Sequence, residues 1–338
     1  MNRSVASASE HGCVRAARCG EMNTTARFLP RLLPRLLPRL LRYQAERFPL
    51  AAYAPLVAIA SVAAIGWSRA TRGAPGYVSA SHGLTAALTM LTAFAVLRVA
   101  DEHKDAALDR VARPELPVPR GLVTLGELRL TASLAIAAVV ALNAYLMPAT
   151  LVSLAAVALW TALMTREFFV PEWLRSHPAL YLASHMVVLP LILLYGSTVD
   201  WLSASAAPPR GLIVFLAASY ASGLVLELGR KLREPLAERP GVETYTVVWG
   251  IKRALLVWGC ALLAASILIG ASMQLAGSSV ALAAAVPAIA ALVVASAAPA
   301  LAAGQPGSGK RIESRSALFT LLAYVALALP WLLRLIAP

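Results

Sequence analysis

The chain contains only four aspartates, and three of them, Asp101, Asp105 and Asp109, lie four residues apart directly after a long apolar segment. Residues four apart share one face of a helix, so the three carboxylates are predicted to project from one stripe. Like charges at this spacing destabilise a helix by roughly 0.2–0.5 kcal/mol per pair unless a cation lies between them. The spacing therefore predicts a site for a cation or a cationic ligand at this point.

The neighbouring residues indicate which cation this is. Mg²⁺ prefers oxygen ligands and commonly combines a few carboxylates with substrate phosphates and water. Glu102 adds a fourth carboxylate, and the same loop carries four basic residues: Lys104, Arg110, Arg113 and Arg120. Guanidinium groups bind phosphate oxygens in a bidentate manner. We interpret the loop as a site for a metal-bound diphosphate. The alternative is a solvated loop whose acidic and basic side chains pair with one another.

A second charged loop spans residues 227–253, and three interpretations of it remain open. Glu227 and Glu234 are seven residues apart and Lys231 is four after Glu227, so all three share a helix face. In the first interpretation, the two glutamates form a second metal site. In the second, Arg230 and Lys231 bind the diphosphate in place of one metal ion. In the third, Glu227 and Lys231 form an ordinary ion pair and the protein is not catalytic.

Two isolated polar residues adjoin or interrupt apolar segments. Arg166 follows such a segment, where it either reaches the diphosphate or anchors the helix at the membrane surface. His185 lies inside a segment, where an ionisable residue is costly and faces the bundle interior. It either contacts an acceptor molecule or is a hydrogen-bonded structural histidine.

The composition predicts an integral membrane protein. Of the 338 residues, 59% are hydrophobic and 14% charged, against about 45–50% and about 25% in soluble domains. Small residues are frequent in the apolar segments, which favours close helix packing in lipid. Nine apolar segments have roughly the 20-residue length that crosses a bilayer. They lie near Leu50–Trp67, Val78–Val99, Leu128–Met147, Ala149–Met164, Pro178–Tyr195, Gly211–Leu226, Ala254–Leu275, Val280–Ala302 and Ala317–Ile336.

The distribution of basic residues predicts the orientation. With the N-terminus in the cytoplasm, 24 Lys and Arg residues lie in cytoplasmic segments and four in outside segments, as the positive-inside rule requires. Both charged loops are then cytoplasmic and the C-terminus is outside. The same rule accounts for the net charge of +13, so no nucleic-acid partner is predicted.

Residues 1–45 are predicted to be a basic, poorly ordered extension that precedes a membrane domain at residues 46–338. Proline recurs every fourth position at Pro30, Pro34 and Pro38, and this interval is expected to forbid a regular helix. Association of the extension with an anionic lipid surface is the alternative interpretation.

The first loop resembles the first signature of the intramembrane prenyltransferases of the UbiA superfamily, Asn-Asp-x-x-Asp-x-x-x-Asp followed by an Arg-Pro segment. Asp101 stands at the Asn position, Glu102 at the first Asp, and Asp105 and Asp109 at the other two; Arg113-Pro114 and Arg120-Gly121 fit the trailing segment. In the second loop, Gly241, Val242 and Thr244 match the tail of the family's second motif. The aspartates of that motif are replaced by Glu227 and Glu234 with basic neighbours.

The resemblance implies an all-α bundle of nine transmembrane helices around a central cavity that is closed by cytoplasmic loops. It also implies Mg²⁺-dependent transfer of a prenyl group from a polyprenyl diphosphate to a hydrophobic or aromatic acceptor, in contact with membrane lipid. A bacterial inner membrane is the expected location. The alternative is a non-catalytic or transport protein of the same fold that binds a divalent cation or an isoprenoid lipid.

The resemblance also implies roles for individual residues. Asp101, Asp105 and Asp109 are the expected catalytic residues. The expected metal ligands are Asp101, Glu102, Asp105, Asp109, Glu227 and Glu234, and the expected diphosphate-binding residues are Lys104, Arg110, Arg113, Arg120, Arg166, Arg230 and Lys231.

Overall fold

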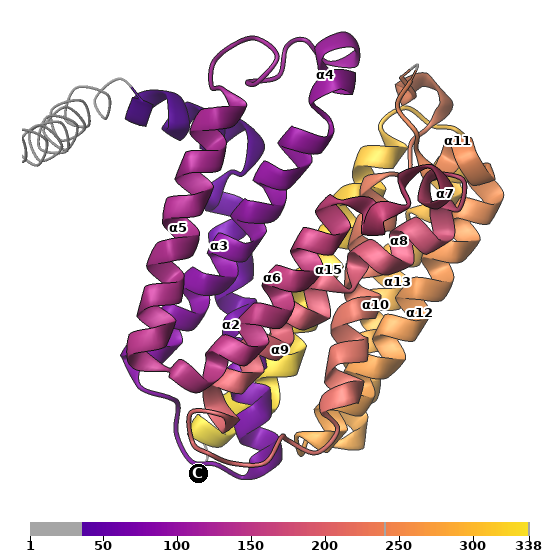
Figure 1. The fold of residues 1–338 in the computed structure, drawn as a ribbon. Coiled ribbons are helices and arrows are strands. Elements are labelled where there is room, and N and C mark those ends of the chain that lie inside the picture. Colours follow the sequence, from indigo (N-terminus) through magenta and orange to yellow (C-terminus); the bar gives the residue numbers. More distant parts are fainter. Residues whose placement is uncertain (1–35, 240, 337–338) are drawn as a thin grey trace, which may run out of the picture.

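The computed structural model describes residues 36–239 and 241–336. This part of the chain is helical without a strand, and it holds nine helical segments long and apolar enough to cross a membrane. They pack side by side as a bundle (Figure 1). The prediction of an all-α, nine-span membrane protein is confirmed.

The membrane spans have the following bounds. They are α2 Leu50–Arg72, α3 Ala80–Lys104, α5 Leu125–Leu146, η1 Pro148–Thr150 with α6 Leu151–Thr165, α8 Pro178–Met186 with α9 Val188–Trp201, α10 Leu212–Arg230, α12 Ile251–Leu275, α13 Val280–Ala295 with α14 Ala298–Ala302, and α15 Ser308–Ile336. The short elements between them are α4 Ala106–Ala112, η2 Glu167–Phe169, α7 Pro171–Arg175, η3 Pro235–Ala237 and α11 Tyr245–Trp249.

Two spans differ from their predicted form in ways that affect the site. The second was expected to end at Val99, but α3 continues to Lys104, so the first acidic residues of the motif lie in its last turn. The fifth is broken at Val187 into α8 and α9. Pro190 lacks the N–H that would bond the carbonyl of Met186, and this explains the break.

Small residues allow the spans to approach closely. A Cβ atom on Gly196 of α9 would lie 2.9 Å from the Cβ of Ala64 in α2, and one on Gly229 of α10 would overlap the Oγ of Ser316 in α15. In the core, the indole N–H of Trp67 donates to the carbonyl of Ser272 at 2.8 Å. The same ring stacks on Phe215 with 4.6 Å between centroids, so this residue joins α2, α10 and α12.

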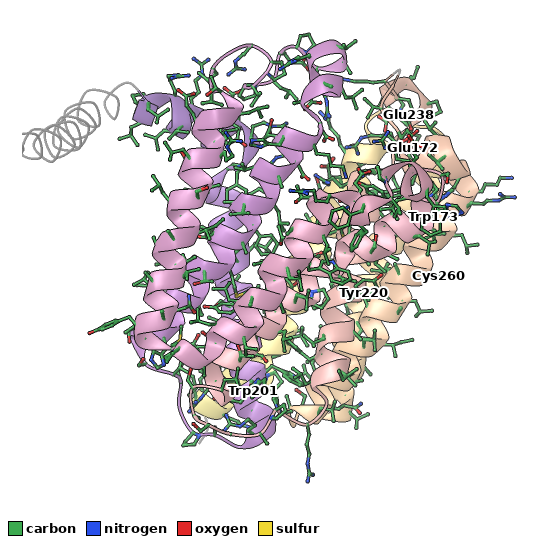
Figure 2. The ribbon with its side chains drawn as sticks, in the orientation of Figure 1. Glu172, Trp173, Trp201, Tyr220, Glu238 and Cys260 are labelled. Atoms are coloured by element: carbon green, nitrogen blue, oxygen red, sulfur yellow. The ribbon has the colours of Figure 1, made fainter. Side chains whose placement is uncertain are left out.

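All short helices between the spans, except η1, belong to one end of the bundle. Figure 1 shows α4, α7 and α11 at this end and the C-terminus at the opposite end. Both charged loops therefore share one face of the molecule, which we call the loop face. Trp173 and Trp201 lie at opposite ends of the bundle (Figure 2), as is typical of aromatic residues at the two membrane interfaces.

Residues 36–47 form a helix that packs on the loop face, although the proline run was expected to forbid one. Three ion pairs among the described residues attach this helix. Arg39 Nη1 lies 2.8 Å from Glu127 Oε1 of α5, Arg47 Nε lies 2.6 Å from Glu102 Oε1 of α3, and Glu46 Oε1 lies 2.7 Å from Arg120 Nη2. The rest of the predicted extension, residues 1–35, lies outside the described residues.

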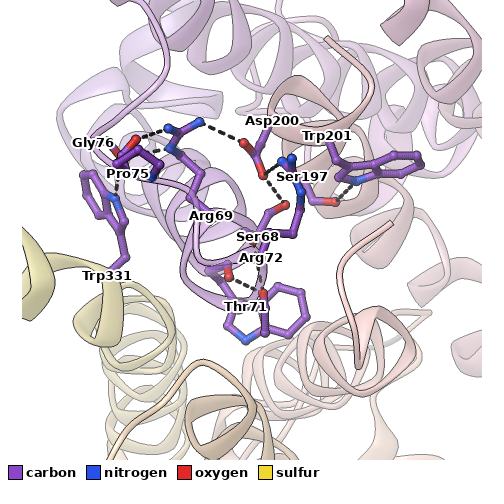
Figure 3. A network of polar contacts seen from close by, with 11 residues as sticks. Ser68, Arg69, Thr71, Arg72, Pro75, Gly76, Ser197, Asp200, Trp201 and Trp331 are labelled. Carbon is purple, nitrogen blue, oxygen red and sulfur yellow. Dashed lines mark hydrogen bonds and ion pairs between the residues drawn. The ribbon is translucent and has the colours of Figure 1, made fainter. Parts of the chain in front are cut away.

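The fourth aspartate, Asp200, joins α2 and α9 at the end opposite the loop face (Figure 3). Its carboxylate lies 2.9 Å from Arg69 Nη1 and 2.7 Å from Arg72 Nη1, and it accepts the hydroxyl hydrogen of Ser68 at 2.7 Å. Asp200 is buried. Its two guanidinium partners and the hydroxyl compensate the desolvation of the carboxylate, and this explains why an acid is tolerated here.

Candidate functional site

The three aspartates of the first motif do not form one continuous stripe. Asp105 links α3 to α4; its N–H donates to the Asp101 carbonyl at 2.9 Å, and its own carbonyl accepts from the N–H of Asp109 at 2.8 Å. Asp109 lies in α4, is only 2% exposed, and has its Oδ1 2.5 Å from Arg113 Nη2. The helical hydrogen bonding continues past Asp105, but the carboxylate of Asp109 faces its own arginine.

Glu102, the fourth carboxylate of the motif, is engaged by two arginines. It is 1% exposed, with Oε1 2.6 Å from Arg47 Nε and 3.4 Å from Arg98 Nε. Arg98 comes from the same helix and Arg47 from the helix at residues 36–47. In this arrangement Glu102 anchors that helix to the end of α3, rather than facing the position expected for a metal.

The chemistry of the remaining carboxylates fits a magnesium site that substrate phosphates would complete. Among the described residues, no three acidic, histidine or cysteine side chains converge as they would at a preformed metal centre. Asp101 is 48% exposed and its only ion pair in the described chain is a long one, 3.8 Å, to Arg98. Asp105 makes no ion pair with the described residues. One or two carboxylates together with phosphates and water are a common donor set for Mg²⁺.

The second motif forms an ion-paired cluster at the end of α10. Glu227 Oε2 lies 2.8 Å from Arg230 Nη2, and Glu227 Oε1 lies 2.9 Å from Lys231 Nζ. Arg230 and Lys231 lie where α10 ends and the second loop begins. Glu227 holds two cations at this point, which favours the second and third interpretations of the loop over a glutamate metal site.

Glu234 has a structural role, in place of the metal-binding role expected for it. Its Oε1 accepts the N–H of Gly307 at 2.7 Å, and its Oε2 accepts the N–H of Gly309 at 2.8 Å. These are the unpaired donors at the N-terminus of α15, where a carboxylate is favourable. Burial disfavours the charged form, but the hydrogen bonds outweigh it and hold the pKa of Glu234 below its usual range.

Tyr245 joins the second loop to this cluster. Its N–H donates to the carbonyl of Lys231 at 3.2 Å, and the Lys231 ammonium lies 5.6 Å from the centre of its ring. The ring also stacks on Trp249. Burial and the neighbouring Glu227 carboxylate raise the pKa of the phenol, so Tyr245 is a neutral hydrogen-bonding group at ordinary pH.

A small cavity lies between the ends of α3, α6 and α8. Its lining combines apolar residues with a carboxylate, an ammonium group and an imidazole: Leu97, Ala100, Asp101, Lys104, Met164, Thr165 and His185. The two charged residues come from the first motif and the imidazole from the fifth span. An aspartate, a lysine and a histidine thus meet at one hollow beneath the loop face.

Lys104 is positioned by residues of α8 and η2. Its ammonium group lies 2.6 Å from Glu167 Oε1, donates to the Tyr181 hydroxyl, and lies 4.7 Å from the centre of the Tyr181 ring. Glu167, Phe168 and Phe169 all have positive φ angles, 47°, 52° and 63°. Left-handed backbone costs about 1–2 kcal/mol per non-glycine residue. The strained turn places Glu167, which is buried, against Lys104.

The other predicted diphosphate-binding residues lie away from this cavity or have partners of their own. Arg113 pairs with Asp109. Arg120 Nη2 lies 2.7 Å from Glu46 Oε1 and supports the helix at residues 36–47. Arg110 and Arg166 are exposed. Of the seven basic residues, Lys104 lines the cavity, and Arg230 and Lys231 share Glu227 as a partner at the end of α10.

Sequence reasoning missed several residues that shape the site, because each one comes from a distant part of the chain. Arg47 lies 55 residues before Glu102, and Tyr181 lies 77 residues after Lys104. Glu167 gave a weak local signal, as a glutamate directly after the basic Arg166. The remaining contacts carry no spacing that could have been recognised.

The arrangement of helices matches solved structures of membrane proteins. The apo structure of a UbiA homologue from Aeropyrum pernix K1 superposes with a TM-score of 0.62 at 16% identity, covering 83% of this chain and 98% of that one. The chain has the UbiA fold.

Two further UbiA-fold structures agree. A UbiA homologue from Archaeoglobus fulgidus, bound to DMAPP and Mg²⁺, gives a TM-score of 0.54 at 15% identity and covers 84% of this chain and 98% of that one. A structure of a digeranylgeranylglyceryl phosphate synthase gives 0.56 at 15% identity, with 83% and 98% covered. No protein-family model and no curated protein sequence matches the chain.

Proposed function

We propose that the protein is a membrane-embedded prenyltransferase that moves a prenyl group from a polyprenyl diphosphate to a hydrophobic or aromatic acceptor in a Mg²⁺-dependent reaction. The observation that carries this proposal is that Asp101 and Lys104, at the end of α3, line one cavity of a UbiA fold, while Glu227 holds Arg230 and Lys231 at the end of α10. The archaeal homologue bound to DMAPP and Mg²⁺ supports the proposal by analogy.

In this proposal, the loop face binds the diphosphate headgroup. Asp101 and Asp105 would hold Mg²⁺, which when bound neutralises phosphate oxygens and stabilises the leaving group as a Lewis acid. Lys104, Arg230 and Lys231 would bind the remaining phosphate oxygens. Glu102 and Asp109 act as positioning residues, because each is buried and held by an arginine.

Charge develops on the diphosphate as the allylic C–O bond breaks. Cations that are fixed in place before the reaction stabilise this charge without reorganisation. Glu167 and Tyr181 fix Lys104, and Glu227 fixes Arg230 and Lys231. The apolar interior of the bundle would exclude water from the allylic cation, which would otherwise react to give the prenyl alcohol.

The proposal is tested with purified protein in lipid vesicles, labelled prenyl diphosphates of several chain lengths, Mg²⁺ and a panel of phenols and lipid alcohols. Release of diphosphate with formation of a prenylated product is the expected result, together with its loss in Asp105→Asn. Glu115→Gln is the matched control, since Glu115 lies in the same loop and pairs only with the exposed Arg239 in the described chain. Equal turnover in Asp105→Asn and wild type would reject the role of this carboxylate.

A second candidate is a non-catalytic protein of the same fold that binds a divalent cation or an isoprenoid lipid. The ion pairs of Glu227 favour it, because they occupy the place where a second acidic motif was expected. It predicts saturable binding of a prenyl diphosphate without product for any acceptor of the panel.

We also propose that the loop face is cytoplasmic, in a bacterial inner membrane. Cysteines introduced at the exposed Glu115 and Ser203, in a background that lacks the native cysteines, lie at opposite ends of the bundle. A membrane-impermeant maleimide added to intact cells should label only the cysteine at position 203. Labelling at position 115 alone would invert the orientation.

A further inference from the structure

His185 presents a buried nitrogen without a partner to the cavity at the end of α3. The side chain is 7% exposed and lines that cavity together with Asp101 and Lys104. Its Nδ1 lies 2.9 Å from the carbonyl oxygen of Tyr181 and 3.3 Å from the hydroxyl of Ser184. Its Nε2 has no hydrogen-bond partner among the described residues.

The surroundings fix both the orientation and the tautomer of this ring. The imidazole stacks on Tyr181 with 4.0 Å between centroids and 10° between planes, and Phe168 meets it edge-on at 6.0 Å. A carbonyl oxygen only accepts hydrogen bonds, so Nδ1 carries the hydrogen and Nε2 keeps its lone pair. A buried nitrogen left unpaired is unfavourable, and a hydrogen-bond donor in the cavity would satisfy it.

We propose that Nε2 of His185 accepts the proton of the prenyl acceptor, and that this acceptor is a neutral compound with a nucleophilic hydroxyl group. The inference rests on the proposed prenyl transfer. The C1–O bond of the prenyl diphosphate breaks, and its electron pair leaves with the diphosphate. The hydroxyl oxygen of the acceptor bonds to C1, and the hydroxyl proton passes to Nε2. The imidazolium then returns the proton to the released diphosphate or to water.

The charges around the cavity favour a neutral hydroxyl compound over a carboxylate. Lys104 is already paired with Glu167 and bonded to Tyr181, and Asp101 adds a negative charge to the same lining. Since Lys104 is also assigned to the diphosphate in the proposed function, an anionic acceptor would find no further cation in the cavity lining, whereas a hydroxyl group would satisfy Nε2. Leu97, Ala100 and Met164 form the apolar part of this lining, and the hollow, about 10 Å³ in volume, has room for the hydroxyl group alone.

His185→Phe separates chemistry from packing. Phenylalanine keeps an aromatic ring between Tyr181 and Phe168 but has no nitrogen. In vesicles with labelled geranylgeranyl diphosphate, Mg²⁺ and hydroxyl acceptors, we expect His185→Phe to bind a non-hydrolysable prenyl thiodiphosphate as tightly as wild type. We expect its transfer rate to fall by about 100-fold or more, as for loss of a general base. Methyl ethers of the same acceptors should not react with the wild-type protein.

Chemical rescue provides the second measurement. His185→Ala leaves room for added imidazole, and the restored transfer rate should rise with the basicity of a series of substituted imidazoles. Ser184→Ala is the control, since the Tyr181 carbonyl still orients the ring in it. Wild-type-like transfer by His185→Phe, or rescue that does not depend on basicity, would overturn the role of His185 but not the proposed function. Absence of diphosphate release by wild type with every hydroxyl acceptor would overturn the proposed function as well.

Discussion

Arg47 and Glu102 form an ion pair of 2.6 Å that joins the helix at residues 36–47 to the last turn of α3. The carboxylate is almost fully buried, and Arg98 is its second partner. The segment that precedes the membrane domain therefore stabilises the same turn that carries Asp101 and Lys104. This ion pair therefore connects the helix at residues 36–47 to the candidate site.

Arg47→Ala is expected to destabilise the protein, because it leaves the buried Glu102 with Arg98 alone. Breaking a buried ion pair typically costs about 3–5 kcal/mol, and the remaining arginine should reduce this cost. A lower midpoint of thermal unfolding in detergent, relative to wild type, is the expected result. Arg42→Ala is the control, since Arg42 is exposed and its pair with Glu46 is longer, 3.4 Å. If both variants unfold at the wild-type temperature, the ion pair does not anchor the helix.

Asp101→Asn and Asp105→Asn should each lower prenyl transfer by about 100-fold or more, as expected for loss of a group that stabilises charge in the transition state. The unfolding midpoint should stay near that of wild type, since neither side chain forms a close ion pair within the described chain. Steady-state release of diphosphate, measured beside thermal unfolding, checks both parts. If the activity of these variants falls only because they unfold at a lower temperature than wild type, these carboxylates are structural.

Asp200→Asn should reduce stability but not ligand binding. The substitution leaves Arg69 and Arg72 without the carboxylate that both contact, and a loss of about 3–5 kcal/mol is typical of such a change. Asp200 is next to Trp201, which lies at the end opposite the loop face (Figure 2), so the affinity for a prenyl thiodiphosphate should not change. Arg210→Gln, an exposed charge at the same end, is the control. Weaker binding in Asp200→Asn, at a temperature where it is folded, would contradict this separation.

The hydrogen bonds of Glu234 predict a specific dependence of stability on pH. The pKa of Glu234 is lowered in the folded protein, so its contribution is fully present above the unfolded value of about 4.3. It is lost as the pH falls through the folded pKa. The stability difference between wild type and Glu234→Gln should therefore shrink as the pH is lowered from 6 toward 3. Thermal unfolding across this range measures it, with the exposed Glu172→Gln as control. A difference that does not change with pH would contradict the capping role.

Features of the chain that depend on local composition could be predicted from the sequence. The apolar lengths identified nine spans, and the spacing of charged residues located the two loops that carry the candidate site. The even number of spans between the two loops, four, also places them together, because every second connection lies at the same end. Even here the ends of the spans were inexact. The helix α3 does not end where its apolar residues end. Its backbone hydrogen bonds continue past them, so Lys104 still belongs to α3.

The tertiary structure decided which partner each charged side chain contacts. The i, i+4 spacing gave Glu227 and Lys231 a common face, and this contact is present. The same reasoning predicted that Glu234 is a metal ligand. In the folded chain its carboxylate instead accepts hydrogen bonds from Gly307 and Gly309, 73 and 75 residues away. Sequence periodicity fixes the face of a helix on which a residue lies, but it does not fix what the opposite helix presents to that face. For that reason the residues of the candidate site could be located from the sequence, while the roles of Glu102, Glu234 and His185 depend on the packing of the bundle.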